Sequence, residues 1–229
     1  MSSSDIDFDS LNQRLEKMNP AEILWWTLFD QFHDKRVVAT SSFQSQSLLL
    51  LFLIGKICPS LSVFFLDTGY HFRETHEYVR LLQVKLGLSV VSILPDASTF
   101  DDGMYETDPD MCCYLRKVEP LKKAFSDVDV WISGIRRDQT ENRRSIKILE
   151  LHSPLNVIKI SPMANLTSAI HKEANMRLDL PEHPLKAIGY SSIGCTHCTS
   201  LPKDLGERSG RWAGSLKTEC GLHLNQPKP

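Results

Sequence analysis

The sequence predicts an α/β fold with a mostly parallel central sheet of about five to six strands and a loop-rich C-terminal tail. Short apolar segments typical of strands alternate along the chain with segments of helical periodicity. The strand segments are apolar throughout, which fits a sheet that is covered by helices on both faces. Beyond about residue 180 the pattern ends, and frequent proline and glycine residues predict an irregular tail.

The individual elements follow from periodicity and from the residues that begin and end them. Residues 10–34 predict one or two helices, with Pro20 in a first turn and with Trp25 and Trp26 packed in the protein. Further helices are expected at about residues 48–56 and 71–86, and Gly87 should end the second of these. The strands are predicted at residues 37–40, 62–66, 89–94, 129–133 and 157–160.

Composition limits the class of protein. A chain of 229 residues can form one sizeable core, and we expect a single domain over residues 1–205 followed by a flexible tail, 206–229. The formal net charge of −2 argues against nucleic-acid binding through bulk charge. The most apolar stretch, residues 48–54, is too short to span a membrane, and no segment resembles a signal peptide. We therefore expect a cytoplasmic protein, whose oligomeric state the sequence leaves open.

Three polar turns follow predicted strands: residues 41–47, 67–69 and 134–137. In a parallel sheet such turns meet at the C-terminal edge of the strands, where ligands bind. The serine-rich loop 41–47 precedes a helix, so it predicts either an anion site at a helix N-terminus or simply a serine cap. The sequence therefore predicts a ligand site at this edge.

The third turn opens a segment with four arginines, Arg136, Arg137, Arg143 and Arg144. Guanidinium groups suit the oxygens of phosphate and sulfate. A solvated basic surface is the simpler interpretation of such a cluster, but its position at the predicted binding edge favours a functional role.

Four of the six cysteines form two tight pairs, Cys112-Cys113 and Cys195-x-x-Cys198. In a reducing compartment such pairs indicate a metal site rather than disulfides. Adjacent cysteines fit poorly around one tetrahedral ion, so an iron–sulfur cluster is favoured modestly over zinc. Cys58 lies in an apolar stretch and is expected to be an inert core thiol.

Cys220 stands apart, nine residues from the end of the sequence. Lys217 and His223 would lower the pKa of its thiol, whereas Glu219 would oppose this. These neighbours are typical of a reactive cysteine, and an incidental thiol near a chain end is the alternative.

Taken together, these motifs resemble those of the assimilatory sulfonucleotide reductases, which act on adenylyl sulfate (APS) or phosphoadenylyl sulfate (PAPS). The presence of both cysteine pairs is similar to the iron–sulfur-containing APS reductase branch. The resemblance covers about residues 37–223 and rests on the following segments, in the order of the family: Ser41-Ser42-Phe43, Leu66-Asp67-Thr68-Gly69, Cys112-Cys113-x-x-Arg116-Lys117, Gly134-Ile135-Arg136-Arg137-Asp138-Gln139, Ile193-Gly194-Cys195-x-x-Cys198-Thr199, Gly210-Arg211-Trp212-Ala213-Gly214 and Lys217-Thr218-Glu219-Cys220-Gly221-Leu222-His223.

The resemblance implies a Rossmann-like, adenine-nucleotide-binding domain related to the ATP-pyrophosphatase fold, and a two-step reaction. The thiolate of Cys220 would attack the sulfur of APS, and thioredoxin or a similar dithiol would release sulfite from the S-sulfonate. A [4Fe-4S] cluster would be bound by Cys112, Cys113, Cys195 and Cys198. The implied substrate ligands are Ser41, Ser42, Thr68, Gly69, Lys117, Arg136, Arg208, Arg211 and His223, and Arg137 is an alternative to Arg136.

The sequence departs from the family at two places. Gln44-Ser45-Gln46-Ser47 stands where many relatives carry glycine and acidic residues, and this loss of negative charge leaves PAPS reduction or dual use of APS and PAPS open. Ser200-Leu201 stands where relatives often have arginine. A non-catalytic, metal-stabilised nucleotide-binding protein is a further alternative. For an enzyme, we expect the segment around residues 206–221 to close over the substrate and to open for thioredoxin.

Overall fold

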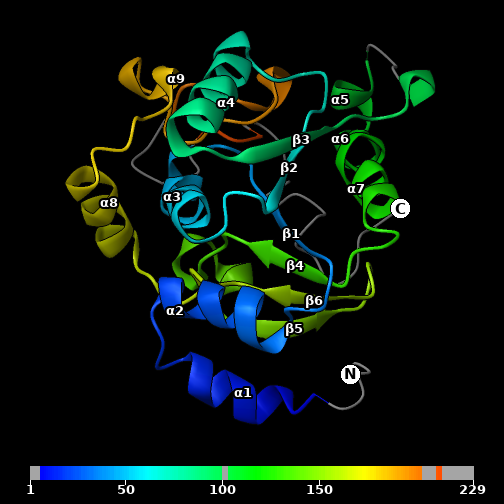
Figure 1. Cartoon of the computed structure of the whole chain (residues 1–229). Helices are drawn as coiled ribbons and strands as arrows, with labels where there is room; N and C mark the ends of the chain where they lie inside the picture. Colours follow the sequence, from blue (N-terminus) through cyan, green and yellow to red (C-terminus); the bar gives the residue numbers. More distant parts are fainter. Residues whose placement is uncertain (1–5, 100–102, 203–209, 213–229) are drawn as a thin grey trace.

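The structure, a computed structural model, describes residues 6–99, 103–202 and 210–212. Its centre is a six-stranded sheet with the order β3-β2-β1-β4-β6-β5. Each neighbouring pair is parallel except β5 and β6, which are antiparallel. This confirms the predicted α/β class and strand number (Figure 1). The strands are β1 (Val37–Thr40), β2 (Ser62–Leu66), β3 (Ser89–Ile93), β4 (Val130–Ser133), β5 (Leu149–His152) and β6 (Val157–Ile160).

Helices precede, connect and follow the strands. The α-helices are α1 (Phe8–Leu15), α2 (Pro20–Trp25), α3 (Leu48–Ile57), α4 (Arg73–Leu86), α5 (Met104–Thr107), α6 (Pro109–Cys113), α7 (Glu119–Ala124), α8 (Ser168–Arg177) and α9 (Pro184–Ala187). Two wider, π-helical turns are η2 (Trp26–Gln31) and η5 (Tyr114–Val118). Short 3-10 turns are η3 (Ser45–Ser47), η4 (Ala97–Thr99), η6 (Arg137–Gln139), η7 (Glu141–Arg143) and η8 (Thr196–Cys198). Within the described ranges, no helix has the length and apolar character needed to cross a membrane.

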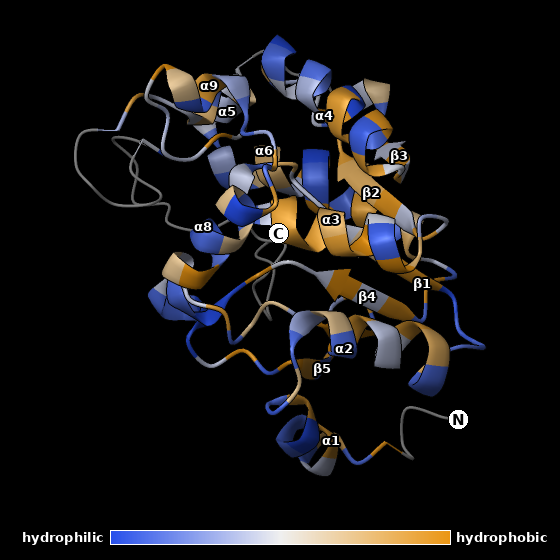
Figure 2. Cartoon of the chain, turned by 60° about the vertical axis from the view of Figure 1, so that its left-hand side comes forward, coloured by the Kyte–Doolittle hydropathy of each residue, from blue (hydrophilic) through white to orange (hydrophobic). Residues whose placement is uncertain are grey.

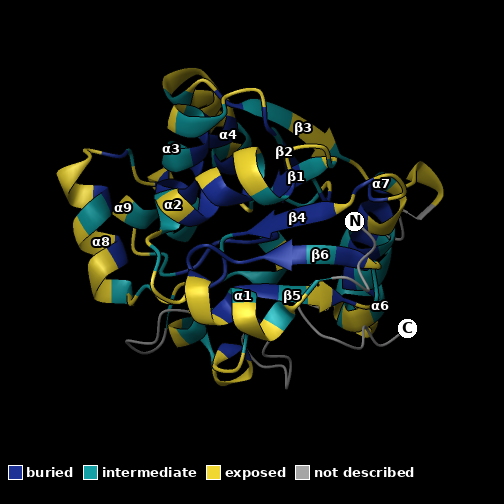
Figure 3. Ribbon diagram, turned by 60° about the horizontal axis from the view of Figure 1, so that its bottom comes forward, coloured by how far each residue is buried: buried dark blue, intermediate teal, exposed yellow. Residues whose placement is uncertain are grey.

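The central strands supply side chains to two hydrophobic cores, one on each face of the sheet. Val38, Phe64 and Trp131 pack with α7 in the smaller core. Their neighbours in the strands face the larger core with α2, α3 and α4, because successive side chains of a strand point to opposite faces. The apolar colouring of β2 and β4 and the burial of β4 reflect this double cover (Figures 2 and 3).

Most predicted elements are confirmed, including the end of α4 at Gly87, which adopts φ +66°. Two details differ. The sequence reasoning missed β5, a four-residue edge strand whose short pattern is too brief to recognise. Asn12 of α1 covers this edge by bonding both the N–H and the carbonyl of Leu149. The prediction that Trp25 packs inside was wrong, because 57% of it is exposed, whereas Trp26 is buried.

Helices α3 and α4 cross closely at a glycine (Figure 1). A Cβ atom built on Gly55 would lie 2.2 Å from the carbonyl oxygen of Leu86. That atom belongs to the backbone at the end of α4, so it cannot move without shifting the helix. Only glycine therefore permits this helix spacing.

We predict that Gly55→Ala destabilises the protein by about 1–3 kcal/mol, which lowers Tm by roughly 2–12 °C. The matched control is Gly103→Ala, since a Cβ there meets no described atom within 4 Å. Thermal unfolding of both variants measures the difference. Equal Tm values for the two variants would show that the helices separate at little cost.

The imidazole of His152 is buried at the end of β5, with its ring edge against Trp131. Burial, together with the nearby charge of Lys159, lowers the pKa of His152 to about 4. The native state therefore holds this histidine neutral, whereas the unfolded chain binds a proton near pH 6.5. Stability that is fully present above pH 6.5 is lost as the pH falls toward 4.

We predict that His152→Phe makes Tm less sensitive to acid between pH 6.5 and 4.5. The substitution removes one proton that the unfolded protein binds in this range and the native protein does not. The slope that this proton contributes is at most about 1.4 kcal/mol per pH unit. Tm measured across this range, with the exposed His33→Phe as control, tests the assignment. A slope unchanged from the parent protein would contradict it.

Candidate functional site

A pocket of about 180 Å³ opens at the C-terminal ends of β1, β2 and β4. The loop that precedes α3 forms one wall, and the start of α4 forms another. Two more walls come from the turn after β4 and from Arg211 and Trp212. The predicted ligand site therefore exists where the strand order places it.

The serine loop reverses sharply over this pocket. Phe43 has a positive φ of 51°, which is unusual for a residue with a side chain. Two contacts hold it: its N–H donates to Oγ of Ser41, and its buried ring packs edge-on against Phe65 at 5.6 Å. The turn leaves Ser41, Ser42 and Ser47 in the lining, and the Ser47 side chain makes no cap bond at the start of α3. The start of α3 therefore adjoins the pocket, with its first N–H groups bonded to the preceding turn: Ser47 donates to the carbonyl of Gln44 and Leu48 to that of Ser45.

Three cations line the pocket: Lys117, Arg143 and Arg211. Arg211 pairs with Thr199 in a β-bridge, donates from Nε to the carbonyl of Cys198, and lies 4.5 Å from the ring of Trp212. Its guanidinium crosses Gly194 so closely that a Cβ there would lie 2.3 Å from it. The missing side chain at Gly194 thus makes room for this cation.

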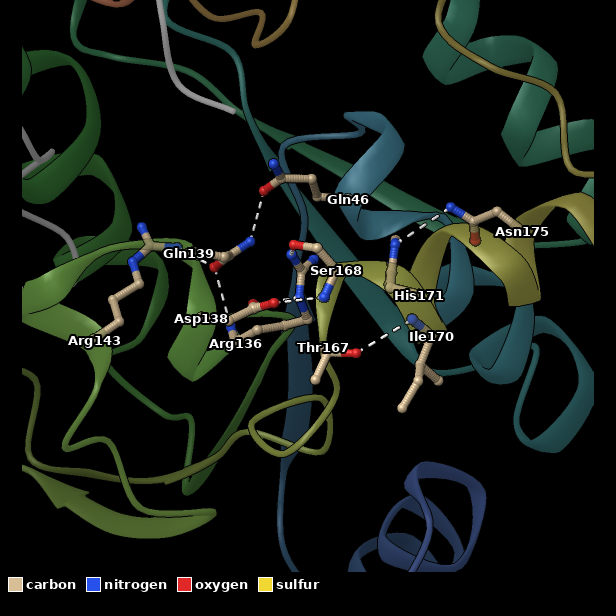
Figure 4. Close-up of polar contacts among 10 residues, drawn as sticks. All are labelled: Gln46, Arg136, Asp138, Gln139, Arg143, Thr167, Ser168, Ile170, His171 and Asn175. Atoms are coloured by element: carbon tan, nitrogen blue, oxygen red, sulfur yellow. Dashed lines mark hydrogen bonds and ion pairs between the residues drawn. The ribbon is translucent and has the colours of Figure 1, made fainter. Parts of the chain in front are cut away.

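Arg136 and Arg137 point elsewhere. Arg136 is 1% exposed and lines a neighbouring cavity, where it bonds Oδ1 of Asp138 at 2.9 Å and Oγ of Ser168 at 2.8 Å (Figure 4). Arg137 bonds Glu16 and the carbonyl of Ile146. The arginine of this segment that lines the pocket is Arg143. The resemblance does not include it among the implied ligands.

Gln139 joins the arginine turn to the serine loop (Figure 4). Its Oε1 accepts from the N–H of Arg136 and from Nη1 of Arg143, while its Nε2 donates to Oε1 of Gln46 at 2.6 Å. Both the oxygen and the nitrogen of this amide are therefore bonded, and they connect the arginine turn to the serine loop.

The four paired cysteines line a second, small cavity next to the first. Cys112 and Cys113 end α6, whereas Cys195 precedes η8 and Cys198 ends it. Among the residues that the structure describes, no cysteine forms a disulfide. Burial raises the pKa of the Cys112 thiol; the charges of Arg116 and Lys117 oppose this, and Cys195 and Cys198 reinforce it. All four sulfurs therefore share one neighbourhood.

Four thiols are a donor set that suits a structural metal or an iron–sulfur cluster. In the described part of the chain, no three His, Cys, Asp or Glu side chains are grouped closely enough to hold one metal ion. A four-iron cluster takes each thiolate on a different iron, so its ligands surround a wider space. The number and type of the cysteines around this cavity match those of cluster ligands.

Polar and aromatic side chains complete the cysteine cavity. Oγ1 of Thr68 lies 3.2 Å from Sγ of Cys195, and the carbonyl of Thr68 accepts from Arg116. The guanidinium of Arg116 also lies 3.9 Å above the ring of Tyr70. Lys117, on the same helical turn, lines both the cysteine cavity and the pocket.

Two histidines at the start of α4 and α9 line the pocket as well. Burial lowers the pKa values of His71 and His183 to about 4, so both are neutral at pH 7. Nδ1 of His183 accepts from the N–H of Leu185, so its Nε2 donates to Oγ1 of Thr75 at 3.1 Å. Neither histidine belongs to the set of ligands that the resemblance implies, because a lone histidine in a sequence is weak evidence of a ligand.

The structure thus brings some of the implied ligands together and separates others. Ser41, Ser42, Lys117 and Arg211 line the pocket, and Cys112, Cys113, Cys195 and Cys198 line the cavity beside it. Thr68 belongs to the cysteine cavity, Gly69 is exposed in its turn at φ 74°, and Arg136 lies in a third cavity. Arg208, Cys220 and His223 lie outside the described residues.

A comparison with solved structures supports this fold. The phosphoadenylyl-sulfate (PAPS) reductase from Candida auris, solved as a phosphate complex, superposes with a TM-score of 0.77 at 27% identity. The match covers 87% of this chain and 99% of that one. The FMN adenylyltransferase of Candida glabrata, at 13% identity and a TM-score of 0.62, shares the fold alone.

Sequence comparison identifies relatives along nearly the whole chain. A protein of Chelativorans sp. (strain BNC1) named adenosine 5'-phosphosulfate reductase is 44% identical and covers 89% of this chain and 86% of its own length. Adenosine 5'-phosphosulfate reductase 2 of Bacillus subtilis (strain 168) is 36% identical, with 95% and 98% covered. The family model for the phosphoadenosine phosphosulfate reductase domain matches residues 36–201. The chain belongs to this reductase family, as the resemblance of its motifs predicted.

Proposed function

We propose that the protein reduces APS to sulfite and AMP in assimilatory sulfate reduction and so supplies sulfur for cysteine biosynthesis. The observation that carries this proposal is the position of Lys117, which lines both the pocket at the sheet edge and the four-cysteine cavity. Family membership and the names of the relatives support it. A cation at this boundary would meet the charged end of a substrate whose adenosine occupies the pocket.

The chemistry requires a nucleophile and cations. The thiolate of Cys220 would attack the sulfur of APS, the bond from sulfur to the phosphate oxygen would break, and AMP would leave with that electron pair. Lys117 and Arg211 would bind the anionic oxygens of phosphate and sulfate, assisted by Arg208 and His223. Arg143 would be a further cation for the same charge.

The second step needs a dithiol, for which thioredoxin or a similar protein is proposed. One thiolate would attack Sγ of Cys220 and expel sulfite, and the second thiol would resolve the mixed disulfide, leaving a free Cys220 and an oxidised donor. Residues 206–229 would act as a tail that closes for the first step and opens for the second. This cycle suits the reducing cytoplasm, where such donors are kept reduced.

We further propose that Cys112, Cys113, Cys195 and Cys198 hold a [4Fe-4S] cluster. The convergence of these four thiols on one cavity supports this assignment. When bound, the cluster would fix the surrounding segments and act electrostatically near the substrate. Lys117 would then link the cluster to the sulfate end of the substrate from the adjoining helical turn, and the cluster would not need to transfer electrons.

PAPS, or both nucleotides, is the alternative substrate. The similar Candida auris structure is a PAPS reductase, and neutral amides replace the acidic residues of many relatives in the serine loop. Gln44 accepts weakly from Ser192 and Ile193, so this amide occupies a defined place near the pocket. The absence of a carboxylate there would tolerate an added 3'-phosphate.

We predict that Cys220→Ser abolishes turnover of APS and leaves iron and sulfide content at the parent level, because Cys220 is not a cluster ligand. Anaerobic protein mixed with APS should gain the mass of one sulfo group on Cys220, and the variant should gain none.

The ratio of kcat/KM for APS and PAPS assigns the substrate, with APS expected to be preferred. Undiminished turnover by the serine variant would refute the mechanism, and zinc in place of iron would refute the cluster.

We predict that Gly194→Ala raises KM for APS about tenfold or more with little change in Tm, because the new methyl group displaces the guanidinium of Arg211. One charge-assisted hydrogen bond contributes about 1.5–3 kcal/mol. In an Arg211→Ala background the same glycine substitution should have no further effect. Steady-state kinetics of the two single variants and the double variant measure this coupling, and additive effects would contradict it.

A further inference from the structure

His71 lies between β2 and α4 and lines the pocket. Its ring is tilted 34° against that of Phe65 at a centroid distance of 5.0 Å. Nε2 lies 3.0 Å from the carbonyl oxygen of Leu66. A carbonyl oxygen only accepts hydrogen bonds, so the proton of the neutral ring must be on Nε2.

The other ring nitrogen is consequently an acceptor. Nδ1 of His71 is buried and has no hydrogen-bond partner. Among the described residues, no donor lies within hydrogen-bond distance of this nitrogen. A buried acceptor without a partner is unfavourable, so a ligand that brings a donor would recover this free energy.

The substrate class narrows the identity of that donor. The phosphate and sulfate groups of a sulfonucleotide are ionised at neutral pH, and their oxygens only accept hydrogen bonds. The donors of such a nucleotide are the amino group of adenine and the hydroxyl groups of ribose. Lys117, in the same pocket, is a hydrogen-bond donor with a positive charge, so it suits the anionic end of the nucleotide.

We propose that Nδ1 of His71 accepts a hydrogen bond from the adenosine part of the substrate, through the adenine amino group or a ribose hydroxyl. The proposal rests on the sulfonucleotide function above and adds a residue that fixes the nucleoside. Leu66 would orient the ring by accepting from Nε2, so that the acceptor is in place before the nucleotide binds.

Binding of AMP and three analogues to the cluster-loaded full-length protein tests this proposal. The analogues are purine riboside 5'-monophosphate, 2'-deoxy-AMP and 3'-deoxy-AMP, each lacking one donor. Anaerobic calorimetry should show that the parent protein prefers AMP about tenfold over one of them, as expected for one hydrogen bond. In His71→Phe that preference should fall to about one, while the preferences against the other two stay unchanged.

Two further variants separate contact from folding. His71→Asn retains an amide near the position of Nδ1 and should keep part of the preference, whereas the exposed His33→Phe should keep all of it. A preference that persists in His71→Phe, or that falls equally for all three analogues, would overturn the proposal. Failure of the parent protein to bind AMP would instead refute the proposed function, and this inference with it.

Discussion

The two cavities of this protein share a wall, and that wall is a single helical segment. Cys112 and Cys113 end α6, and Lys117 follows within one turn, in η5. Residues this close on a helix project from neighbouring positions, so the cysteines and the lysine cannot move independently. Pro120 lies just beyond and lacks the N–H that would bond the carbonyl of Arg116 in a regular helix, which fits the wide turn here. Whatever occupies the cysteine cavity therefore sets the position of a cation in the nucleotide pocket.

The opposite side of the pocket repeats this coupling. Arg211 is held by the carbonyl of Cys198, and Thr68 contacts Cys195 through its hydroxyl group. Two cations, from separate parts of the sequence, are thus tied to segments that carry cysteines. If the proposed cluster is bound, its role would be structural and electrostatic, because both cations lie on segments that carry its cysteines.

The sequence predicted where the site lies better than it predicted which residues line it. Alternating strands and helices placed three turns at one edge of the sheet, and the pocket lies there. The direction of each side chain within a turn is not encoded in the same way. Arg136 bonds Asp138 and Ser168 in a neighbouring cavity, and the pocket receives Arg143 from the next turn instead. This choice depends on contacts with α8, which the sequence pattern does not reveal.

Histidine illustrates the same limit at the level of one atom. The sequence shows that His71 follows a strand, which is weak evidence of function. Its tautomer depends on the carbonyl of Leu66, and the open acceptor on Nδ1 depends on which donors the fold places around it. Both are tertiary contacts. The missed strand β5 has a comparable cause, because the buried side chain of Asn12 completes its edge from 137 residues away.

Charge follows a similar logic. The chain as a whole carries a net charge of −2, yet the described lining of the pocket contains three cations and no carboxylate. Acidic residues that neutralise neighbouring arginines, such as Asp138 and Glu16, lie outside this lining. Charge–charge interactions are strongest where water is excluded, so separating the acids from the pocket directs its positive field at an anionic ligand. A near-neutral composition therefore conceals a site suited to phosphate and sulfate, and only the fold that sorts the charges makes it apparent.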